Sequence, residues 1–557
     1  MNGLILFEDE HLLVINKPSG INTHKPDRYA PDGIHEWLCK RFGGRDFPAA
    51  RVDSHPPAPL SILHRLDKDT SGVMLFGKTP RANQSLSRQF ESHQVEKQYL
   101  LLSPGRPTRA KFRAKSVDAV TEFELLQPHG RFFLIAARPV TGKTHQIRRH
   151  AAANGFPIVG DAQYGGEAAP HLMLHAHRLT FGHPASGERL MMEASVPGVF
   201  DEMNGVAVAR EFRELLFGEL WEPVSAGESN RGQPPSRREG GKGAATTAWR
   251  LIAGAADGFP DVIVDSYAGN LLVQWQTEGA PKSGQGLLGQ LKKQCAPQTI
   301  YEQLATKQKR TPPQLVWCSG GPVNCRDGSG LMKARRFAEA PRQRVLIREN
   351  ELEFLINFGE GLSTGIFLDQ RENRRRLLAS KIAGKTLLNC FAYTCAFSVA
   401  AAKAGAVTTS VDLSRRYLDW GKDNLRANGL TPDGHGFLVG DVFEWLNRFR
   451  KRGQTWDIVM LDPPTFSTTK KGCAFQAARD YEKLEALAMR VVARGGTLFC
   501  STNQRTLAAD KFEESLRAAA RAAGRVIASL EFETLPFDFR VTEGERPYLK
   551  ALWARLD

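Results

Sequence analysis

The segment from Glu222 to Thr247 separates two parts of this chain, because nothing in it could join a folded core. It reads EPVSAGESNRGQPPSRREGGKGAATT, a run rich in glycine, proline, serine and charge in which apolar residues follow no period. Such a composition is typical of a flexible linker. The whole chain has 557 residues, which is more than a single hydrophobic core usually serves. We therefore expect separate domains on either side of a flexible, basic linker at 222–247.

The part before the linker, residues 1–221, carries the pattern of a β-rich domain. Two short extended runs surround the acidic turn at 8–10, and alternating apolar runs with turn residues continue to about Val199.

The part after the linker changes its pattern once. In 248–349, apolar runs flank turns at 257–258 and 269–270, which predicts a small α+β module. From 350 to 557, helical segments alternate with short β runs. These runs are 385–388, 407–411, 458–461 and 496–500. The alternation predicts a doubly wound α/β domain of the Rossmann type.

The chain is basic, with 75 Lys and Arg against 60 Asp and Glu and a formal net charge of +15. This charge favours a polyanionic partner such as nucleic acid, although a solvated positive face is the alternative. The eight cysteines form no CxxC pair and no zinc-ligand spacing, and no apolar run is long enough to span a bilayer. We expect a soluble, cytoplasmic protein without a metal site or membrane contact.

Residues 64–72 read HRLDKDTSG and place the carboxylate of Asp67 between cations, just before the apolar run 73–76. Taken alone, this pattern is more typical of a surface turn in which Asp67 pairs with Arg65 or Lys68. Other motifs accompany it in the same half of the chain. They are ILFEDEHLLVINKPSG at 5–20, KQY at 97–99, TGKTHQIR at 141–148, PIVGDAQYG at 157–165 and LHAH at 174–177.

Together these segments resemble the large-subunit ribosomal RNA pseudouridine synthase family over roughly residues 1–200. HRLDKDTSG is similar to its HRLDxxTSG signature, and TGKTHQIR is similar to its TGRTHQIR element. The resemblance implies a mixed α+β fold with a central antiparallel sheet. It also implies that Asp67 is the nucleophile, that Arg148 pairs the charge of Asp67, and that Tyr99 stacks on the flipped base and is a candidate for assisting proton removal at C5.

The residue types suit this chemistry. Isomerising uridine breaks the N1–C1′ bond and forms a new bond through C5, so a carboxylate nucleophile suffices and we expect no cofactor for the synthase. The uridine must leave the duplex to be reached, which requires apolar and aromatic walls such as Tyr99 and Ile147. The residues expected to contact RNA are His64, Arg65, Lys143, His145 and Ile147. His145, His150, His175 and His177 lack acidic or cysteine partners at ligand spacing, so we expect no metal.

Two features depart from the family pattern. Lys143 stands where the family has arginine, which keeps the charge but loses a bidentate contact. The synthase-like sequence also begins at Met1, so we expect no separate RNA-binding module before it and substrate capture by the rest of the chain.

A second set of polar residues lies where predicted parallel strands end. Asn389, Asp412, Asp441 and Asp462 follow successive β runs, the last of them in the sequence LDPPTF at 461–466. An adenosylmethionine site in a doubly wound sheet needs such residues for the ribose and the adenine. Each aspartate alone is more often a helix N-cap, but four such positions in order favour a cofactor site.

The same region resembles Rossmann-type ribosomal RNA methyltransferases over about residues 245–557. TGIFLDQRENR at 364–374 is similar to their TGxFLDQRxxR stretch, and the sequence around 250–267 is similar to their small N-terminal module. The resemblance implies an S-adenosyl-L-methionine site. The residues expected to border it are Phe367, Gln370, Asn389, Phe391, Tyr393, Thr394, Asp412, Leu413, Asp441, Val442 and Asp462.

The methylated atom depends on one position. Relatives that methylate carbon 5 of a pyrimidine carry a nucleophilic cysteine after the last parallel strand, where this chain has Asn503 in a loop similar to that of the 7-methylguanosine-forming branch. Guanine N7 is itself nucleophilic and needs only positioning. We expect the acceptor base to lie against Pro463, Pro464, Phe466 and Asn503. Cys500 is expected to be a small buried thiol.

The turn expected to bind the cofactor is the one feature of this half that argues against methyltransferase activity. Relatives usually have Thr-Gly-Gly where this chain has Thr394, Cys395 and Ala396. The added Cβ atoms would crowd the methionine moiety if a positive φ or a close backbone approach is required there.

The sequence therefore predicts a bifunctional enzyme that forms pseudouridine and methylates a base of ribosomal RNA, expected to be guanine N7 in 23S rRNA. Three alternatives stay open. They are a working synthase with a catalytically weak methyltransferase-like half that binds RNA, a 5-methylcytosine methyltransferase, and a non-enzymatic RNA chaperone or ribosome-assembly factor. The sequence does not reveal the modified nucleotides or the oligomeric state.

Overall fold

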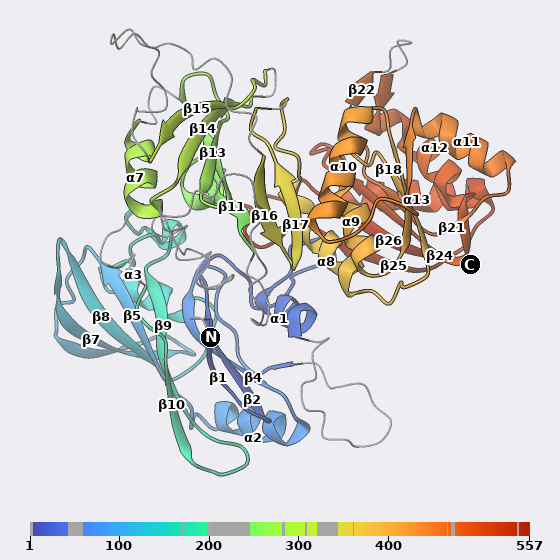
Figure 1. The fold of residues 1–557 in the computed structure, drawn as a ribbon. Coiled ribbons are helices and arrows are strands. Elements are labelled where there is room, and N and C mark those ends of the chain that lie inside the picture. The colour runs from blue at the N-terminus through green and yellow to red at the C-terminus, as the bar shows by residue number, and fades with distance from the viewer. Residues whose placement is uncertain are drawn as a thin grey trace, which may run out of the picture.

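The computed structural model has an N-terminal domain (blue), a middle module (green) and a C-terminal domain (yellow to red), as Figure 1 shows. The structure describes residues 4–42, 60–169, 171–197, 200, 246–280, 285–306, 309–319, 344–359, 361–464, 466–468, 474–542 and 545–557. The predicted linker at 222–247 lies outside the described residues except for Thr246 and Thr247. No helix of the described ranges is both long and apolar enough to cross a membrane.

The N-terminal domain is built on a ten-stranded sheet. Its strands are β1 (Ile5–Glu8), β2 (Leu12–Lys17), β3 (Ser61–Ile62), β4 (Ser71–Gly77), β5 (Glu96–Ser103), β6 (Lys111–Lys115), β7 (Val120–His129), β8 (Phe132–Pro139), β9 (Leu174–Gly182) and β10 (Arg189–Glu193). They lie in the order β1-β2-β4-β9-β5-β8-β7-β6, with β3 beside β4 and β10 beside β9. Neighbours are antiparallel except β4 and β9, which are parallel. The predicted mixed domain with a central antiparallel sheet is confirmed.

Side chains alternate across this sheet, so both of its faces are covered. Leu13 and Ile15 pack with α1 (Ile34–Phe42), whereas Leu12 and Val14 on the same strand pack with α2 (Pro80–Glu91). Every residue of β4 is buried. The loop that carries Asp67 therefore leads into a strand fixed from both sides.

The middle module has a five-stranded sheet in the order β11-β12-β13-β14-β15. Its elements are β11 (Ala248–Ala253), the short helix η2 (Gly254–Asp257), β12 (Val262–Tyr267), β13 (Asn270–Trp275), α7 (Gln285–Cys295), β14 (Thr299–Leu304) and β15 (Gln314–Cys318). A hairpin of β16 (Val345–Glu349) and β17 (Leu352–Ile356) follows, and its apolar residues join the core of the C-terminal domain. The hairpin spans the expected boundary at 349–350, which stays a prediction.

The C-terminal domain is built on a seven-stranded sheet in the order β20-β19-β18-β21-β24-β26-β25. Its strands are β18 (Thr386–Cys390), β19 (Val407–Asp412), β20 (Gly436–Val439), β21 (Trp456–Leu461), β24 (Val492–Thr502), β25 (Ile527–Glu533) and β26 (Lys550–Leu556), and a separate hairpin pairs β22 (Phe466–Thr468) with β23 (Ala474–Gln476). Its helices are η4 (Leu368–Gln370), α8 (Arg371–Ala379), α9 (Ala396–Lys403), α10 (Arg415–Ala427), α11 (Val442–Lys451), α12 (Ala477–Met489) and α13 (Ala509–Ala523). The first five strands of the order are parallel, and β25 and β26 are antiparallel.

Two hydrophobic cores cover the faces of this sheet. Leu387 of β18 packs with α9 in one core, while Leu388 packs with α11, α12 and α13 in the other. The predicted doubly wound fold is confirmed. Because β18, β19, β21 and β24 run parallel, their carboxyl ends meet at one edge, which is where a ligand binds in such sheets.

Candidate active sites

The loop that carries Asp67 joins β3 to β4 in the N-terminal domain and presents Asp67 at the surface. The side chain of Asp67 is 30% exposed, and its backbone carbonyl accepts a hydrogen bond from the amide of Thr70 at 3.1 Å. The neighbouring Leu66 and Thr70 are buried. The loop therefore anchors the chain on both sides of Asp67 while leaving its carboxylate accessible.

Arg148, on α3 (Gln146–Ala153), lies beside this carboxylate and is held from behind. Its Nη1 lies 3.7 Å from Oδ2 of Asp67, while its Nε and Nη2 each donate to Asp161 at 2.8 Å. Asp161 is fully buried. Burial has the largest single effect on the pKa of Arg148 and lowers it, but the hydrogen bonds and charge of Asp161 lead the contributions that raise this pKa above its ordinary value. The bidentate contact fixes the guanidinium plane. Asp161 lies in the motif PIVGDAQYG at 157–165, but nothing in that motif alone points to a contact with Arg148.

Tyr99 and His145 complete the group around Asp67. Tyr99 lies on β5, and burial, followed by the charge of Asp67, raises the pKa of its phenol. Nε2 of His145 lies 3.9 Å from Oδ2 of Asp67, and its Nδ1 lies 3.1 Å from the hydroxyl of Tyr164. His145 has φ of 51°, a left-handed conformation that places its ring at the start of α3. The structure thus brings Asp67, Tyr99 and Arg148 together.

The other residues expected to contact RNA divide into surface and interior positions. Arg65 and Lys143 are exposed, and Nζ of Lys143 lies 3.4 Å from Asp118. His64 accepts a hydrogen bond from the amide of Leu75 at 3.0 Å and stacks on a phenylalanine ring, and burial lowers its pKa to about 3. Ile147 is 6% exposed and packs in the domain core, because consecutive helical residues point in different directions.

The turn after β18 in the C-terminal domain adopts a glycine-like backbone without glycine. Phe391, Tyr393 and Cys395 have φ of 59°, 48° and 62°. The thiol of Cys395 is buried against α10, where Gly421 makes room: a Cβ on Gly421 would lie 2.3 Å from Sγ. Cys395 therefore has a positive φ, which glycine adopts most easily, and its side chain is accommodated by the neighbouring helix.

Two residues predicted to border the cofactor lie around this turn. Asp412 accepts hydrogen bonds from the amides of Tyr393 at 2.8 Å and Ser414 at 2.9 Å, and burial raises its pKa. Asn389 donates to Ser398 at 2.9 Å, while its buried Oδ1 has no partner. An unpaired buried acceptor next to an acid at the strand ends suits a ligand with ammonium and ribose hydroxyl donors, as adenosylmethionine has.

The remaining predicted cofactor residues occupy varied positions. Phe367 is 45% exposed, with its ring 5.4 Å from that of Tyr393, and Leu413 is 49% exposed. The hydroxyl of Thr394 donates to the carbonyl of Gly365 at 2.5 Å. Asp441 caps α11 by accepting from the amide of Glu444, and the side chain of Val442 is buried in the core.

The predicted acceptor loop begins at Asp462. Its Oδ1 accepts from Gln370 at 3.0 Å and from Ser501 at 2.5 Å, and burial raises its pKa to about 6. Pro463 is buried, while Pro464 and Asn503 are exposed. Thr465 and the side chain of Phe466 lie outside the described residues. Ser501 was missed from the sequence, although it follows Cys500 at the carboxyl end of β24.

Cys500 is a buried thiol, as predicted. It is fully buried in the core of the sheet, and burial raises its pKa well above the ordinary value. It therefore offers no accessible thiolate.

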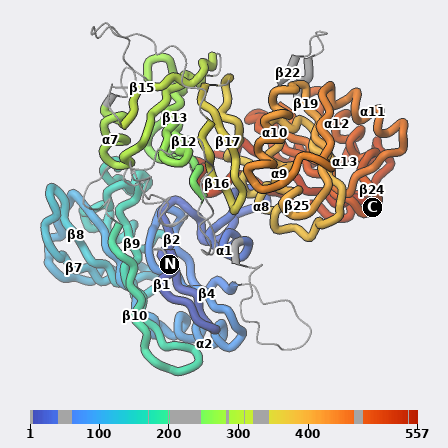
Figure 2. Tube along the Cα trace, viewed as in Figure 1, coloured from blue at the N-terminus to red at the C-terminus, as the bar shows by residue number. Residues whose placement is uncertain are grey.

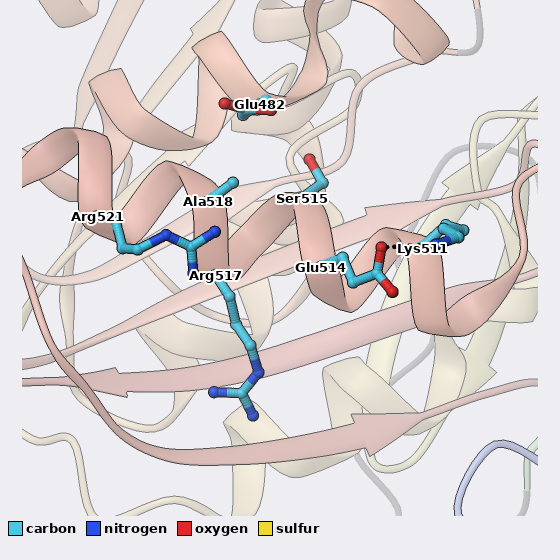
Figure 3. Close-up of a pocket in the computed structure, with 7 residues that line it drawn as sticks. All are labelled: Glu482, Lys511, Glu514, Ser515, Arg517, Ala518 and Arg521. Carbon is cyan, nitrogen blue, oxygen red and sulfur yellow. Dashed lines mark hydrogen bonds and ion pairs between the residues drawn. The ribbon is translucent and has the colours of Figure 1, made fainter.

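A surface depression of about 560 Å³ lies elsewhere, along α12 and α13 (Figure 3). Its lining is mostly charged and includes Lys511, Glu514 and Arg517, and none of its residues belongs to either candidate site. Across the described ranges, no group of three His, Cys, Asp or Glu side chains could hold a metal ion.

Comparison with known proteins agrees with both folds. Residues 11–153 match the RNA pseudouridylate synthase family, and residues 250–540 match the S-adenosylmethionine-dependent methyltransferase family. Ribosomal RNA large subunit methyltransferase I of Shewanella frigidimarina is 34% identical over 313 residues, which cover 56% of this chain and 75% of that protein. The protein of that name from Shewanella amazonensis is 32% identical with the same coverage. The structure of human RNA pseudouridylate synthase domain containing 4 is 25% identical, with a TM-score of 0.29, and the match covers 38% of this chain and 92% of that chain.

The folds and sites define a two-enzyme chain in which an RNA-modifying isomerase domain precedes a methyl-transferring domain. The chain belongs to the S-adenosylmethionine-dependent methyltransferase family, and its N-terminal domain is an RNA pseudouridylate synthase domain.

Proposed function

We propose that both domains modify large-subunit ribosomal RNA, with Asp67 as the synthase nucleophile and guanine N7 as the methyl acceptor. The relatives named above are called ribosomal RNA large subunit methyltransferases, which supports this substrate and, in a bacterial ribosome, 23S rRNA. The net charge of +15 suits a polyanionic substrate.

The observation that carries the synthase proposal is the contact between Asp67 and the anchored guanidinium of Arg148. The carboxylate of Asp67 attacks the flipped uridine, and the N1–C1′ bond breaks with its electron pair on the base. The base turns, C5 bonds to C1′, and the bond to Asp67 breaks and frees the carboxylate. C5 then loses its proton and N1 gains one. Arg148, held by Asp161, lies beside the carboxylate and orients it.

Tyr99 acts in this scheme as a neutral phenol. Burial and the nearby charge of Asp67 both raise its pKa, so its hydroxyl keeps its proton at neutral pH. Tyr99 therefore packs against the base as a neutral phenol, and in this scheme the C5 proton passes to an acceptor such as water.

In the methyltransferase, adenosylmethionine supplies an electrophilic methyl group to a nucleophile placed in line with it. Asn389 offers its free acceptor, and Asp412 offers an acid at the end of β19. Asp462 holds Gln370 and Ser501 through Oδ1, so Oδ2 accepts neither of these bonds. In this proposal Oδ2 accepts hydrogen bonds from N1 and N2 of guanine. Cytosine has no such pair of neighbouring donors.

The position of cysteine also favours guanine over a pyrimidine. Carbon-5 methylation requires a thiolate to add to C6. Cys500 is buried with a raised pKa, and Asn503 occupies the exposed position beyond β24.

Modification mapping of ribosomal RNA tests the proposal. A strain lacking the protein should lose a pseudouridine and a 7-methylguanosine from 23S rRNA, and the wild-type chain should restore both. Asp67→Asn should restore only the 7-methylguanosine, whereas the control Asp27→Asn, at an exposed aspartate of the same domain, should restore both. Loss of a 5-methylcytidine instead would refute the N7 assignment, and an unchanged RNA would refute the substrate.

A further inference from the structure

A segment of the C-terminal domain, residues 534–542 after β25, reaches the N-terminal domain. Figure 2 shows the two domains adjacent at α1 and α8. The ring of Phe537 stacks on Trp37 of α1 at 5.5 Å and packs against the core of the synthase domain. The next residue, Asp538, accepts from the amide of Arg250 at 2.8 Å and pairs with Arg371. The segment is therefore fixed to all three parts of the chain.

Arg540 lies at the centre of this contact. Its Nη1 donates to Asp257 of the middle module at 2.8 Å, and the two side chains are 9% and 1% exposed. The guanidinium covers Gly20 of the synthase: a Cβ there would lie 2.0 Å from Nη2. Gly20 also has φ of 84°, so its lack of a side chain serves both the turn and the arginine.

The turn covered by Arg540 holds the loop that carries Asp67. The amide of Gly20 donates to the carbonyl of Lys68 at 2.8 Å, and Nζ of the buried Lys17 donates to the same carbonyl at 3.0 Å. The hydroxyl of Ser19 donates to the carbonyl of Asp69 at 2.8 Å. Every one of these bonds ends on a residue within two positions of Asp67. A shift of the turn would therefore move the carboxylate.

The last contact runs directly between the domains. Nζ of Lys68 lies 3.4 Å from the carbonyl of Val541, the residue after Arg540. The catalytic loop is thus bound on one side by its own turn and on the other by the methyltransferase domain.

We propose that Arg540, a residue of the methyltransferase domain, is a positioning residue for the synthase and that the isomerase site is complete only in the fused chain. The proposal rests on the proposed role of Asp67. Arg540 contacts neither substrate nor cofactor in this scheme. Its guanidinium packs against Gly20, and the ion pair with Asp257 holds the guanidinium in place. The turn at 17–21 therefore stays packed against the loop that carries Asp67.

The test compares full-length variants for pseudouridine formation on a 23S rRNA fragment. Arg540→Ala should lower kcat about tenfold or more with KM nearly unchanged, because the nucleophile is displaced while the RNA surface is kept. Arg540→Lys should recover part of the loss by keeping the pair with Asp257. Arg28→Ala is the matched control: it breaks the 2.7 Å ion pair to Glu513 between the same two domains and should change kcat by less than about twofold.

A double-mutant cycle makes the contact itself measurable. Gly20→Ala introduces both backbone strain and a collision with Arg540, so it should cost more in the wild-type chain than in the Arg540→Ala background. Additive effects, or a wild-type kcat for Arg540→Ala, would overturn the proposal. Thermal unfolding accompanies each measurement, and if Arg540→Ala does not fold, the same cycle with Arg540→Lys decides.

The same experiments distinguish a failure of the proposed function from a failure of the role proposed for Arg540. Activity retained by Asp67→Asn would refute the nucleophile. An inactive Asp67→Asn variant together with a fully active Arg540→Ala variant would refute only the role of Arg540.

Discussion

The two candidate active sites of this chain are held together in different ways. In the synthase, a partly exposed carboxylate meets a guanidinium that a second, buried carboxylate anchors. In the methyltransferase, a turn with three positive φ values lies next to buried residues that are joined by neutral or singly charged hydrogen bonds. The synthase site depends on the relative positions of charged side chains, and the methyltransferase site depends on the conformation of the backbone.

This difference decides which substitutions each site tolerates. A charged pair loses its function when one group changes its geometry, even if the charge is kept. A shaped turn tolerates a change of residue type when a neighbour makes a compensating change, as Gly421 does for Cys395. Variants that separate geometry from charge should therefore affect the synthase most.

The largest effect is expected for Arg148→Lys. Lysine keeps the positive charge near Asp67 but cannot form the two 2.8 Å bonds to Asp161, so the cation is no longer fixed. Pseudouridine formation should fall about 100-fold, as expected when a catalytic partner is misplaced by about 1 Å. Single-turnover assays with the full-length chain measure the change.

Arg149→Lys provides the matched control, because Arg149 is the exposed neighbour on the same helix. It should alter the rate by less than about twofold, as surface charges contribute little. Methylation should be unchanged in both variants. Equal rates for Arg148→Lys and Arg149→Lys would show that charge alone serves the synthase.

The proximity of Asp67 and Arg148 could be predicted from the sequence, because the motifs contain the two interacting side chains themselves. HRLD and HQIR contain Asp67 and Arg148, and the structure places these two side chains 3.7 Å apart. Asp161 was not assigned, since its role appears only when α3 and η1 (Ala162–Tyr164) meet. Ile147 belongs to the same motif as Arg148 but is buried in the core, and a motif alone does not give the direction of a side chain.

An intermediate effect is expected for the pH dependence of methylation. The pKa of Asp462 is raised to about 6 by burial, so this carboxyl is mostly ionised at pH 7 and gains its proton as the pH falls through 6. If ionised Oδ2 binds the guanine edge, the rate at pH 5 should be about one tenth of the plateau value. Rates measured on a 23S rRNA fragment between pH 5 and pH 8 report this step.

Asp462→Asn should methylate slowly and lose the step, because asparagine presents a fixed amide at every pH in this range. Asp419→Asn changes an exposed aspartate on α10 and should keep the wild-type profile. A step near pH 6 that persists in Asp462→Asn would assign it to another group.

The methyltransferase turn was harder to predict, because it depends on pairs of residues from separate elements. The fold followed from the alternation of helices and strands, and Asp412 followed from its place at a strand end. The effect of replacing glycine with Cys395 depended on α10, and no local pattern links Cys395 to Gly421. The sequence therefore predicted that the side chain of Cys395 would crowd the turn, but it did not show that Gly421 leaves room for this side chain.

The smallest effect is expected for paired substitutions at Cys395 and Gly421, which test whether shape alone governs the turn. Gly421→Ala brings a Cβ to 2.3 Å from the thiol of Cys395 and should lower the free energy of unfolding by about 1–3 kcal/mol through overpacking. It should also weaken adenosylmethionine binding, because Thr394 lies against the same helix position. Adding Cys395→Gly removes the collision and the positive-φ strain, so the double variant should return to within about 1 kcal/mol of the wild type. Urea unfolding and calorimetric titration measure the two quantities. If the double variant is no better than Gly421→Ala, the packing of Cys395 against α10 does not set the turn.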